Sequence, residues 1–372
     1  MRRIGISVLF GALIASATYG HKGFRSAISP DGKNEIRLYL EPLSYEVWRA
    51  GKPVVLRSAI GITGGTSVDF RIRDPYVLAE TNRYYLYETK PWYGGVSVKV
   101  RTSADLKSWS EQAVVMEMPE DIQCTALWAP EVHKYNGKYY LLVTVTEEKG
   151  ARPIAAMGEK VEEKDLVPRG TWGFVSDLPT GPFKPLKRGP LPPVELMTLD
   201  GTLYVEEGKP YLVYCHEWCQ TGNGTIEYAR LTDDLTYFAE RPRVLLTANE
   251  TLAGAGKVTD GCFLYRSETS GVLHLIWSNF VEGHGYCVLT RHSLSGLLAG
   301  PWSEDRILFG ENGGHGMIFR SIDGKLLLSL HQPNEDGKER LKLYALQEYD
   351  GYLRLIQKDG LDQADSTGGK CR

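Results

Sequence analysis

The chain has 372 residues, of which 42% are hydrophobic and 24% are charged, and its formal net charge is -3. This near-neutral balance leaves no basic stripe to neutralise phosphates, so we expect no nucleic-acid partner. Beyond the N-terminus, no apolar run approaches the roughly 20 residues of a membrane-spanning helix, which excludes a multi-span membrane protein. Forty glycines, 19 prolines and 21 tyrosines indicate many tight turns between β-favouring segments, as in an all-β protein.

The N-terminal 17 residues have the organisation of a signal peptide. Arg2 and Arg3 form a positive end, residues 4–14 are apolar, and residues 15–17 provide an Ala-Ser-Ala cleavage site. We therefore expect an exported protein, periplasmic or extracellular, that has no membrane span and is a monomer. A short buried helix is the alternative for this segment.

Two further segments flank the central part of the chain. Residues 18–66 are predicted to be a strand-rich leader that packs on the following domain, and residues 357–372 are a polar tail. The six cysteines are too few for a disulfide scaffold in a chain of this length. Buried thiols and a Cys215–Cys219 bridge both remain open.

Between residues 67 and 356 the chain repeats one unit five times. Each unit starts with a polar residue beside Pro or Gly, followed by an apolar-alternating run, a tight turn and a second apolar run. Such runs with Asn-Gly or Asp-Gly turns are typical of β-hairpins, and each unit has room for two more strands. The repeat predicts a five-bladed β-propeller with four-stranded antiparallel blades around a central channel. A β-sandwich, the alternative, would not explain the repeated polar residue.

The residues that lead the five units should meet at one mouth of the channel, because the first strand of each blade is innermost. They are Asp74, Glu131, Asp200, Asp260 and His315. Clustered carboxylates raise one another's pKa and destabilise a fold, which proteins tolerate mainly at functional sites. Alternatively, each carboxylate could cap a turn on its own. A pair of carboxylates with room for a water molecule suits inverting glycoside hydrolysis, in which one group acts as acid and the other as base.

Aromatic side chains near the strand ends could stack on a sugar ring, although any one of them could instead belong to the core. The candidates are Trp92, Trp128, Trp218 and Trp277.

Five motifs in the repeat resemble those of glycoside hydrolase family 43. In chain order they are Arg73-Asp-Pro-Tyr76, Trp128-Ala-Pro-Glu131, Leu199-Asp-Gly-Thr202, Thr259-Asp-Gly261 and Gly313-Gly-His-Gly316. The resemblance covers residues 70–346 and implies a five-bladed propeller that inverts the anomeric centre with an Asp base, a pKa-modulating Asp and a Glu acid. It implies activity on α-L-arabinofuranosides, β-xylosides or galactosides.

Carried over residue by residue, the resemblance makes Asp74 the base and Asp200 the modulator. His315 matches a channel histidine that often helps to hold Ca²⁺ or Na⁺, usually through water, and such an ion would be structural or electrostatic. No cofactor is required for the chemistry itself. Glu131 is expected to bind substrate.

The acid position departs from the family pattern. Where the family has Glu-Gly-Pro, this chain has Asp260-Gly-Cys262, and the aspartate is one methylene shorter. Glu217 follows the second strand of the third unit and should return to the same face, so we favour Glu217 as the acid and keep Asp260 as the alternative.

The sequence thus predicts an exported, inverting and exo-acting α-L-arabinofuranosidase that acts on plant-type polysaccharides or oligosaccharides. A β-xylosidase or galactosidase of the same family, a catalytically silent carbohydrate-binding propeller and a retaining fructosidase of related families are the alternatives.

Overall fold

The computed structural model of the chain describes most of the residues beyond the N-terminus. The described ranges are 24–29, 31–40, 43–59, 65–66, 70–89, 97–254, 256–349 and 351–356. The predicted signal peptide, Trp92 and the predicted polar tail lie outside them. No helix in the described ranges is long and apolar enough to cross a membrane.

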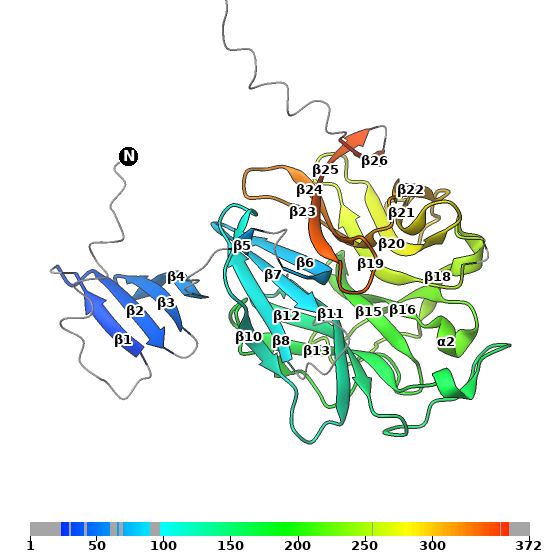
Figure 1. The fold of residues 1–372 in the computed structure, drawn as a ribbon, viewed down its shortest axis with the longest axis horizontal. Coiled ribbons are helices and arrows are strands. Elements are labelled where there is room, and N and C mark those ends of the chain that lie inside the picture. Colours follow the sequence, from blue (N-terminus) through cyan, green and yellow to red (C-terminus); the bar gives the residue numbers. More distant parts are fainter. Residues whose placement is uncertain are drawn as a thin grey trace, which may run out of the picture.

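The predicted leader forms a sheet of its own. It is an antiparallel meander of β1 (Phe24–Ile28), β2 (Asn34–Leu40), β3 (Leu43–Arg49) and β4 (Lys52–Ala59). This sheet lies to one side of the main body (Figure 1), and β4 contacts β8.

Five four-stranded antiparallel sheets form the main body, and the predicted five-bladed propeller is confirmed. Blade one consists of β6 (Arg73–Glu80), β7 (Arg83–Thr89), β8 (Ser97–Ser103) and β10 (Ala113–Glu117), and β5 (Gly65–Thr66) pairs beside it with β9 (Ser108–Trp109). Blade two consists of β11 (Cys124–Tyr135), β12 (Lys138–Glu147), β13 (Arg169–Ser176) and β14 (Lys184–Pro185). Blade three consists of β15 (Thr198–Glu206), β16 (Lys209–His216), β17 (Thr225–Arg230) and β18 (Arg243–Thr247).

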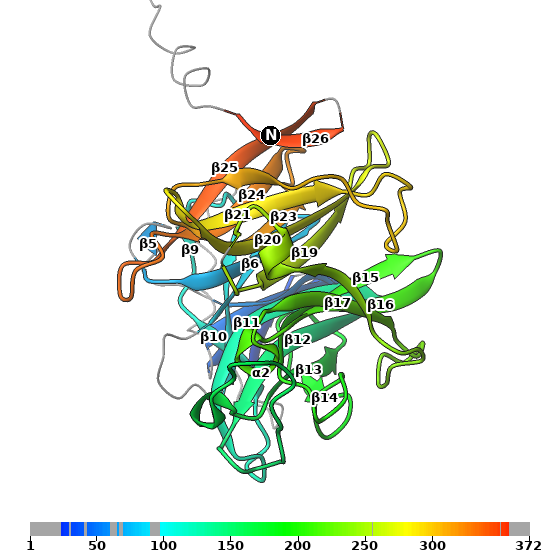
Figure 2. The ribbon, with the colours of Figure 1, turned by 90° about the vertical axis from the view of Figure 1, so that its right-hand side faces the viewer.

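The last two blades follow the same plan. Blade four consists of β19 (Asp260–Arg266), β20 (Leu273–Val281), β21 (Gly285–His292) and β22 (Arg306–Phe309), and blade five of β23 (Gly314–Arg320), β24 (Leu326–Gln332), β25 (Arg340–Tyr349) and β26 (Tyr352–Leu355). Helical structure in the described ranges is limited to η1 (Glu163–Asp165), α2 (Trp218–Thr221) and η2 (Ala248–Glu250). Figures 1 and 2 show the blades succeeding one another in chain order, from light-blue β6 to red-orange β25.

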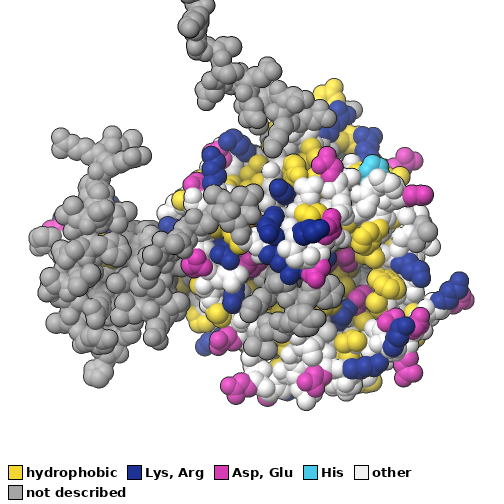
Figure 3. Space-filling view, viewed as in Figure 1, with side chains coloured by type: hydrophobic (Ala, Val, Ile, Leu, Met, Phe, Trp, Pro, Cys, Tyr) yellow, Lys and Arg dark blue, Asp and Glu magenta, His cyan; other side chains and the backbone are white. Residues whose placement is uncertain are grey.

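The core lies between the blades, where second strands are covered on both faces. Along β7, residues 84–87 are all buried, and along β20 every side chain from Leu273 to Asn279 is buried. Strands covered on both faces read as continuous apolar runs rather than alternating ones, which explains the Tyr- and Leu-rich segments of the repeat. On the face shown in Figure 3, acidic and basic side chains are interspersed, as the near-neutral net charge leads one to expect.

Side chains close the ring between blades one and five. The strand β6 packs on β23 and β24, and Ser329 donates a hydrogen bond to the carbonyl of Pro75 at 3.0 Å. Glu339, whose side chain has no exposed surface, pairs with Arg71 at 2.8 Å and with Arg73 at 3.4 Å. Blades that are distant in sequence are therefore joined by a buried ion-pair cluster.

Candidate active site

A cavity of about 220 Å³ opens at the mouth of the channel, where the first strands of the blades begin. It is lined by Arg73, Asp74, Trp128, Leu199, Asp200, Glu217, Trp218, Val258, Asp260 and His315. Six of the candidate site residues, together with His315, therefore lie around one cavity. Its volume is below the roughly 300–1,000 Å³ of sites for drug-sized ligands, which suits a single sugar residue.

A left-handed residue, called the head residue below, lies inside a β-bulge of the first strand of every blade. These residues are Asp74 (φ 51°), Ala129 (φ 44°), Asp200 (φ 52°), Gly261 (φ 54°) and His315 (φ 50°). Positive φ is costly for residues other than glycine and persists where the surroundings fix it, often at functional sites. The fivefold repeat seen in the sequence is thus a repeat of one strained backbone conformation.

In blades two and four the left-handed residue is not the one that the sequence predicted to lead the unit. Glu131 lies two positions beyond the true head, Ala129, and is not part of the cavity wall. It is buried, with its Oε2 2.8 Å from Nε2 of His133, so it does not lie at the mouth where it was expected, and its binding of substrate stays a prediction. Asp260 precedes the head residue Gly261 by one position and still lines the cavity.

Three of the five left-handed heads are held by side chains from the preceding blade, each on a second strand. Asp200 donates its backbone N–H to Oγ1 of Thr144 on β12 (2.8 Å), His315 to Oγ of Ser278 on β20 (2.8 Å), and Asp74 to Nδ1 of His331 on β24 (3.3 Å). In blade four the N–H of Gly261 instead bonds Oδ2 of Asp200 at 2.9 Å. The site side chains are therefore aimed by a backbone that neighbouring blades fix.

The carboxylate of Asp74 lies beside two histidines and an arginine. Its Oδ1 is 3.2 Å from Nδ1 of His315, 3.4 Å from Nδ1 of His331 and 3.7 Å from Nε of Arg73. Burial alone would raise the pKa of Asp74, but His315, His331 and Arg73 outweigh it and hold the pKa well below its usual range. Asp74 is therefore ionised and able to accept a proton from water.

The pKa of His315 is shifted in the opposite direction, upward. Burial would lower its pKa, but the carboxylates of Asp74, Asp200 and Asp260 raise it. The carboxylates therefore favour the protonated imidazole, whose Nδ1 is 3.8 Å from Oδ2 of Asp200.

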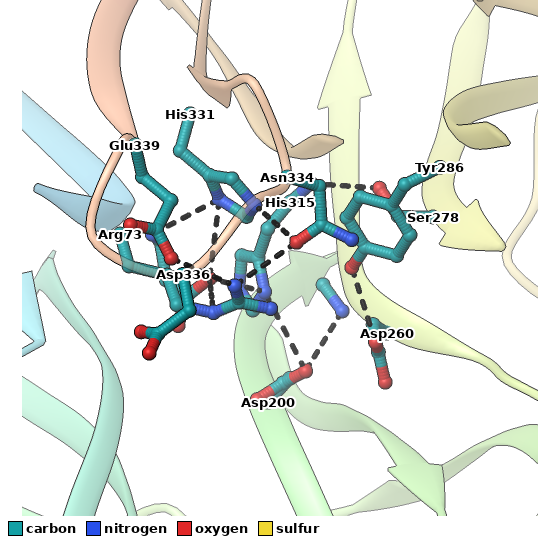
Figure 4. A network of polar contacts seen from close by, with 12 residues as sticks. Arg73, Asp200, Asp260, Ser278, Tyr286, His315, His331, Asn334, Asp336 and Glu339 are labelled. Atoms are coloured by element: carbon teal, nitrogen blue, oxygen red, sulfur yellow. Dashed lines mark hydrogen bonds and ion pairs between the residues drawn. The ribbon is translucent and has the colours of Figure 1, made fainter. Parts of the chain in front are cut away.

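The pKa values of Asp200 and Asp260 are shifted in the opposite direction from that of Asp74. Burial raises the pKa of Asp200 to about 7, helped by Asp260 and Asp74 and opposed by His315. Burial also raises the pKa of Asp260, although the phenol of Tyr286 donates to its Oδ2 at 3.0 Å, as drawn in Figure 4. One ionised carboxylate thus faces two that are readily protonated.

Glu217 enters the cavity from blade three, at the turn between β16 and α2. Its backbone N–H bonds the carbonyl of Met197 at 2.9 Å, and its Oε1 pairs with Arg169. Its Oε2 is buried and has no hydrogen-bond partner among the described residues. Burial raises the pKa of Glu217 despite the opposing charge of Arg169, which is the direction a general acid requires.

The predicted tryptophan platforms are divided between the site and the core. Trp128 and Trp218 line the cavity, and Trp218 is 37% exposed. Trp277 has no exposed surface and packs in the core of blades three and four, so its predicted role in sugar stacking is wrong. Trp92 lies outside the described residues.

Sequence reasoning missed the residues that support the carboxylates. Tyr286 and His331 stack at 5.8 Å between ring centroids and contact Asp260 and Asp74, respectively. A signal existed for His331, because it occupies the same second-strand position as Thr144 and Ser278. No comparable signal marked Tyr286.

The described side chains do not fit direct binding of a metal ion. None of their His, Cys, Asp and Glu residues form a group of three or more arranged to hold an ion. Nδ1 of His315 faces Asp74, and the raised pKa of the imidazole disfavours the neutral form that a metal requires. An ion held through water in the channel stays a prediction.

Carboxyl groups whose pKa values are shifted in opposite directions around one cavity are an arrangement that glycoside hydrolysis can use. The family model described as glycosyl hydrolases family 43 matches residues 68–348. The chain belongs to this family and is a glycosidase that hydrolyses O-glycosyl bonds.

Similar proteins agree with this assignment. An extracellular exo-α-(1→5)-L-arabinofuranosidase of Streptomyces chartreusis is 24% identical over 240 residues, which cover 63% of this chain and 69% of the relative. The crystal structure of an endo-arabinase of Bacteroides thetaiotaomicron is 32% identical, covers 77% of this chain and 98% of its own, and has a TM-score of 0.67. An exo-1,5-α-L-arabinanase from a bovine ruminal metagenomic library (18% identity, TM-score 0.57, covering 78% of this chain and 98% of its own) shares the fold.

Proposed function

We propose that this glycosidase is a secreted, inverting and exo-acting α-L-arabinofuranosidase that acts on plant polysaccharides or their oligosaccharides. In this proposal Asp74 deprotonates the attacking water, Glu217 protonates the leaving oxygen and Asp200 tunes the site. Secretion rests on the signal-peptide pattern and on the extracellular relative. Arabinose specificity is supported by the arabinofuranosidase and the endo-arabinase to which the chain is similar.

The proposal rests on two carboxyl groups in one cavity whose pKa values are shifted in opposite directions. Positive neighbours lower the pKa of Asp74, whereas burial raises the pKa of Glu217. In addition, Oε2 of Glu217 has no hydrogen-bond partner among the described residues. Environments that push two pKa values apart assign the base and the acid. Asp260, whose Oδ2 accepts the Tyr286 phenol and whose side chain is one methylene shorter than the family's Glu, is the alternative acid.

The acid assignment is tested with two leaving groups. A general acid contributes about 10²–10⁴-fold where the leaving group needs a proton. Glu217→Gln should therefore lose this factor on an arabino-oligosaccharide and lose little on a dinitrophenyl arabinofuranoside, whose leaving group departs as a stable anion. Asp260→Asn should slow both substrates about equally. Selectivity in the Asp260 variant instead would show that the acid stands at the family position.

An endo-acting arabinanase is the second candidate, because the 32% identical solved structure is an endo-arabinase. The small cavity favours exo action, since a chain cut internally needs space on both sides of the scissile bond. Incubation with linear arabinan and with nitrophenyl α-L-arabinofuranoside and β-D-xyloside separates the candidates. Exo action releases arabinose from the start, endo action first yields oligosaccharides, and cleavage of the xyloside alone would refute arabinose specificity.

A further inference from the structure

The structure places one side chain, Arg169, in contact with both the proposed acid and a sugar platform. Arg169 begins β13 and is only 12% exposed. Its Nη1 pairs with Oε1 of Glu217, and its guanidinium carbon lies 4.1 Å from the centre of the Trp128 ring. Its Nε donates to Oγ1 of Thr146 at 3.1 Å. A planar guanidinium can stack by its face and donate by its edge at the same time, which a lysine ammonium cannot do.

The arginine is itself anchored by the charged segment between β12 and β13. Arg152 donates to the backbone carbonyl of Arg169 at 2.8 Å and pairs through Nε with Glu147 at 2.7 Å. Both ends of Arg169, backbone and guanidinium, are therefore fixed by hydrogen bonds. Side chains locked in this way can hold a reacting group in a productive geometry.

The chemistry of this contact determines where the proton of the acid resides. A guanidinium has only donors, so the oxygen that faces it must accept. In neutral Glu217 the proton must then sit on Oε2, the buried oxygen that lacks a protein partner. We infer that Arg169 is a positioning residue that places the acidic proton of Glu217 on Oε2 and supports Trp128 against the same substrate. This inference rests on the proposed role of Glu217.

The pH profile provides a readout that a purely structural role would not change. The charged or titratable groups around Glu217 are Arg169 on β13, Asp260 on β19, His216 at the end of β16 and Cys219 on α2. Arg169 lowers the pKa of Glu217, whereas Asp260 raises it. An acid must be protonated to act, so kcat/KM falls at alkaline pH as Glu217 ionises. Removing the guanidinium should therefore move this alkaline limb to higher pH.

The experiment compares Arg169→Gln with Arg169→Lys on the two arabinosides used above. Arg169→Gln should lower kcat/KM about 10²-fold on the oligosaccharide, at the low end for an acid–base group, and less than about tenfold on the dinitrophenyl substrate. The alkaline limb of the pH profile of Arg169→Gln should move to higher pH. Arg169→Lys keeps the charge and should leave the limb in place, while KM rises because Trp128 loses its stacking partner. The matched control is Arg188→Gln, which removes an exposed arginine paired with Asp121 and should behave as the wild type.

The outcomes separate the two claims. If Glu217→Gln is selective for the oligosaccharide but Arg169→Gln slows both substrates equally with an unmoved limb, the role of Arg169 is refuted and that of Glu217 stands. If Glu217→Gln shows no selectivity, the acid assignment fails and the inference fails with it. If Arg169→Gln does not fold, a shifted alkaline limb or an unchanged KM in Arg169→Lys contradicts the inference.

Discussion

Replacing Asp200 with Asn should abolish hydrolysis and at the same time stabilise the fold at neutral pH. Asp200 is buried, and its pKa is about 7 in the fold against an ordinary value of 3.8. Because one pKa unit corresponds to about 1.4 kcal/mol, keeping this carboxylate ionised costs the folded state about 4 kcal/mol. An amide has no such cost, and its oxygen can still accept the N–H of Gly261.

The sign of the pH dependence follows from the raised pKa. Below about pH 4 Asp200 is protonated in both the folded and the unfolded chain, so Asp200→Asn brings no gain. Between about pH 4 and pH 7 only the unfolded chain ionises, and the advantage of the variant grows with pH; above pH 7 it levels off. The loss of the Asp200 contact to His315 offsets part of the gain, so we expect roughly 2–4 kcal/mol at pH 8.

Urea unfolding at pH 4.5 and pH 8, followed by tryptophan fluorescence, measures this difference, and arabinoside hydrolysis confirms the loss of activity. Asp74→Asn is the matched control, because the lowered pKa of Asp74 means that its ionised form stabilises the fold. That variant should be inactive and less stable at pH 8. The reasoning is refuted if Asp200→Asn is destabilised at pH 8, or if its advantage is the same at both pH values.

Three further predictions concern the ring, the tryptophans and the channel. Glu339→Ala should lower the free energy of unfolding by about 3 kcal/mol in urea, because two arginines lose a buried partner; an unchanged midpoint would contradict this. Trp277→Phe should lower the free energy of unfolding by about 2 kcal/mol and leave KM unchanged. Trp128→Ala should raise KM. A raised KM in Trp277→Phe and an unchanged KM in Trp128→Ala would show that Trp277, not Trp128, contacts the substrate. If a hydrated ion occupies the channel, a chelator should lower the melting temperature of the wild type, and that of His315→Ala by less. Melting curves that the chelator leaves unchanged in both proteins would argue against an ion.

The propeller could be predicted from the sequence because its blades are local. Hairpins with short turns leave paired apolar runs separated by turn residues, and the left-handed head position recurs once in each blade. Asp74, Asp200 and His315 were found in this way, since each stands at a left-handed head. Their polar character made the repeat visible.

Register and burial were harder to predict because they depend on neighbouring strands. The first strand of blade two has 12 residues and starts at Cys124, so the head falls on the small apolar Ala129 rather than on Glu131. Trp277 lies on a second strand, which blade packing covers completely. Its position near the end of a predicted strand did not indicate that it would be buried. The contact between Arg169 and Glu217 joins residues 48 positions apart, and no spacing rule anticipates it.

The most direct test of the proposed mechanism is the configuration of the first sugar released. Proton NMR during the first minutes of hydrolysis of an α-L-arabino-oligosaccharide distinguishes the anomers before they equilibrate. Direct attack by a water that Asp74 deprotonates predicts β-L-arabinofuranose as the first product. Release of the α anomer first would show a covalent intermediate and would contradict the role of Asp74 as a base.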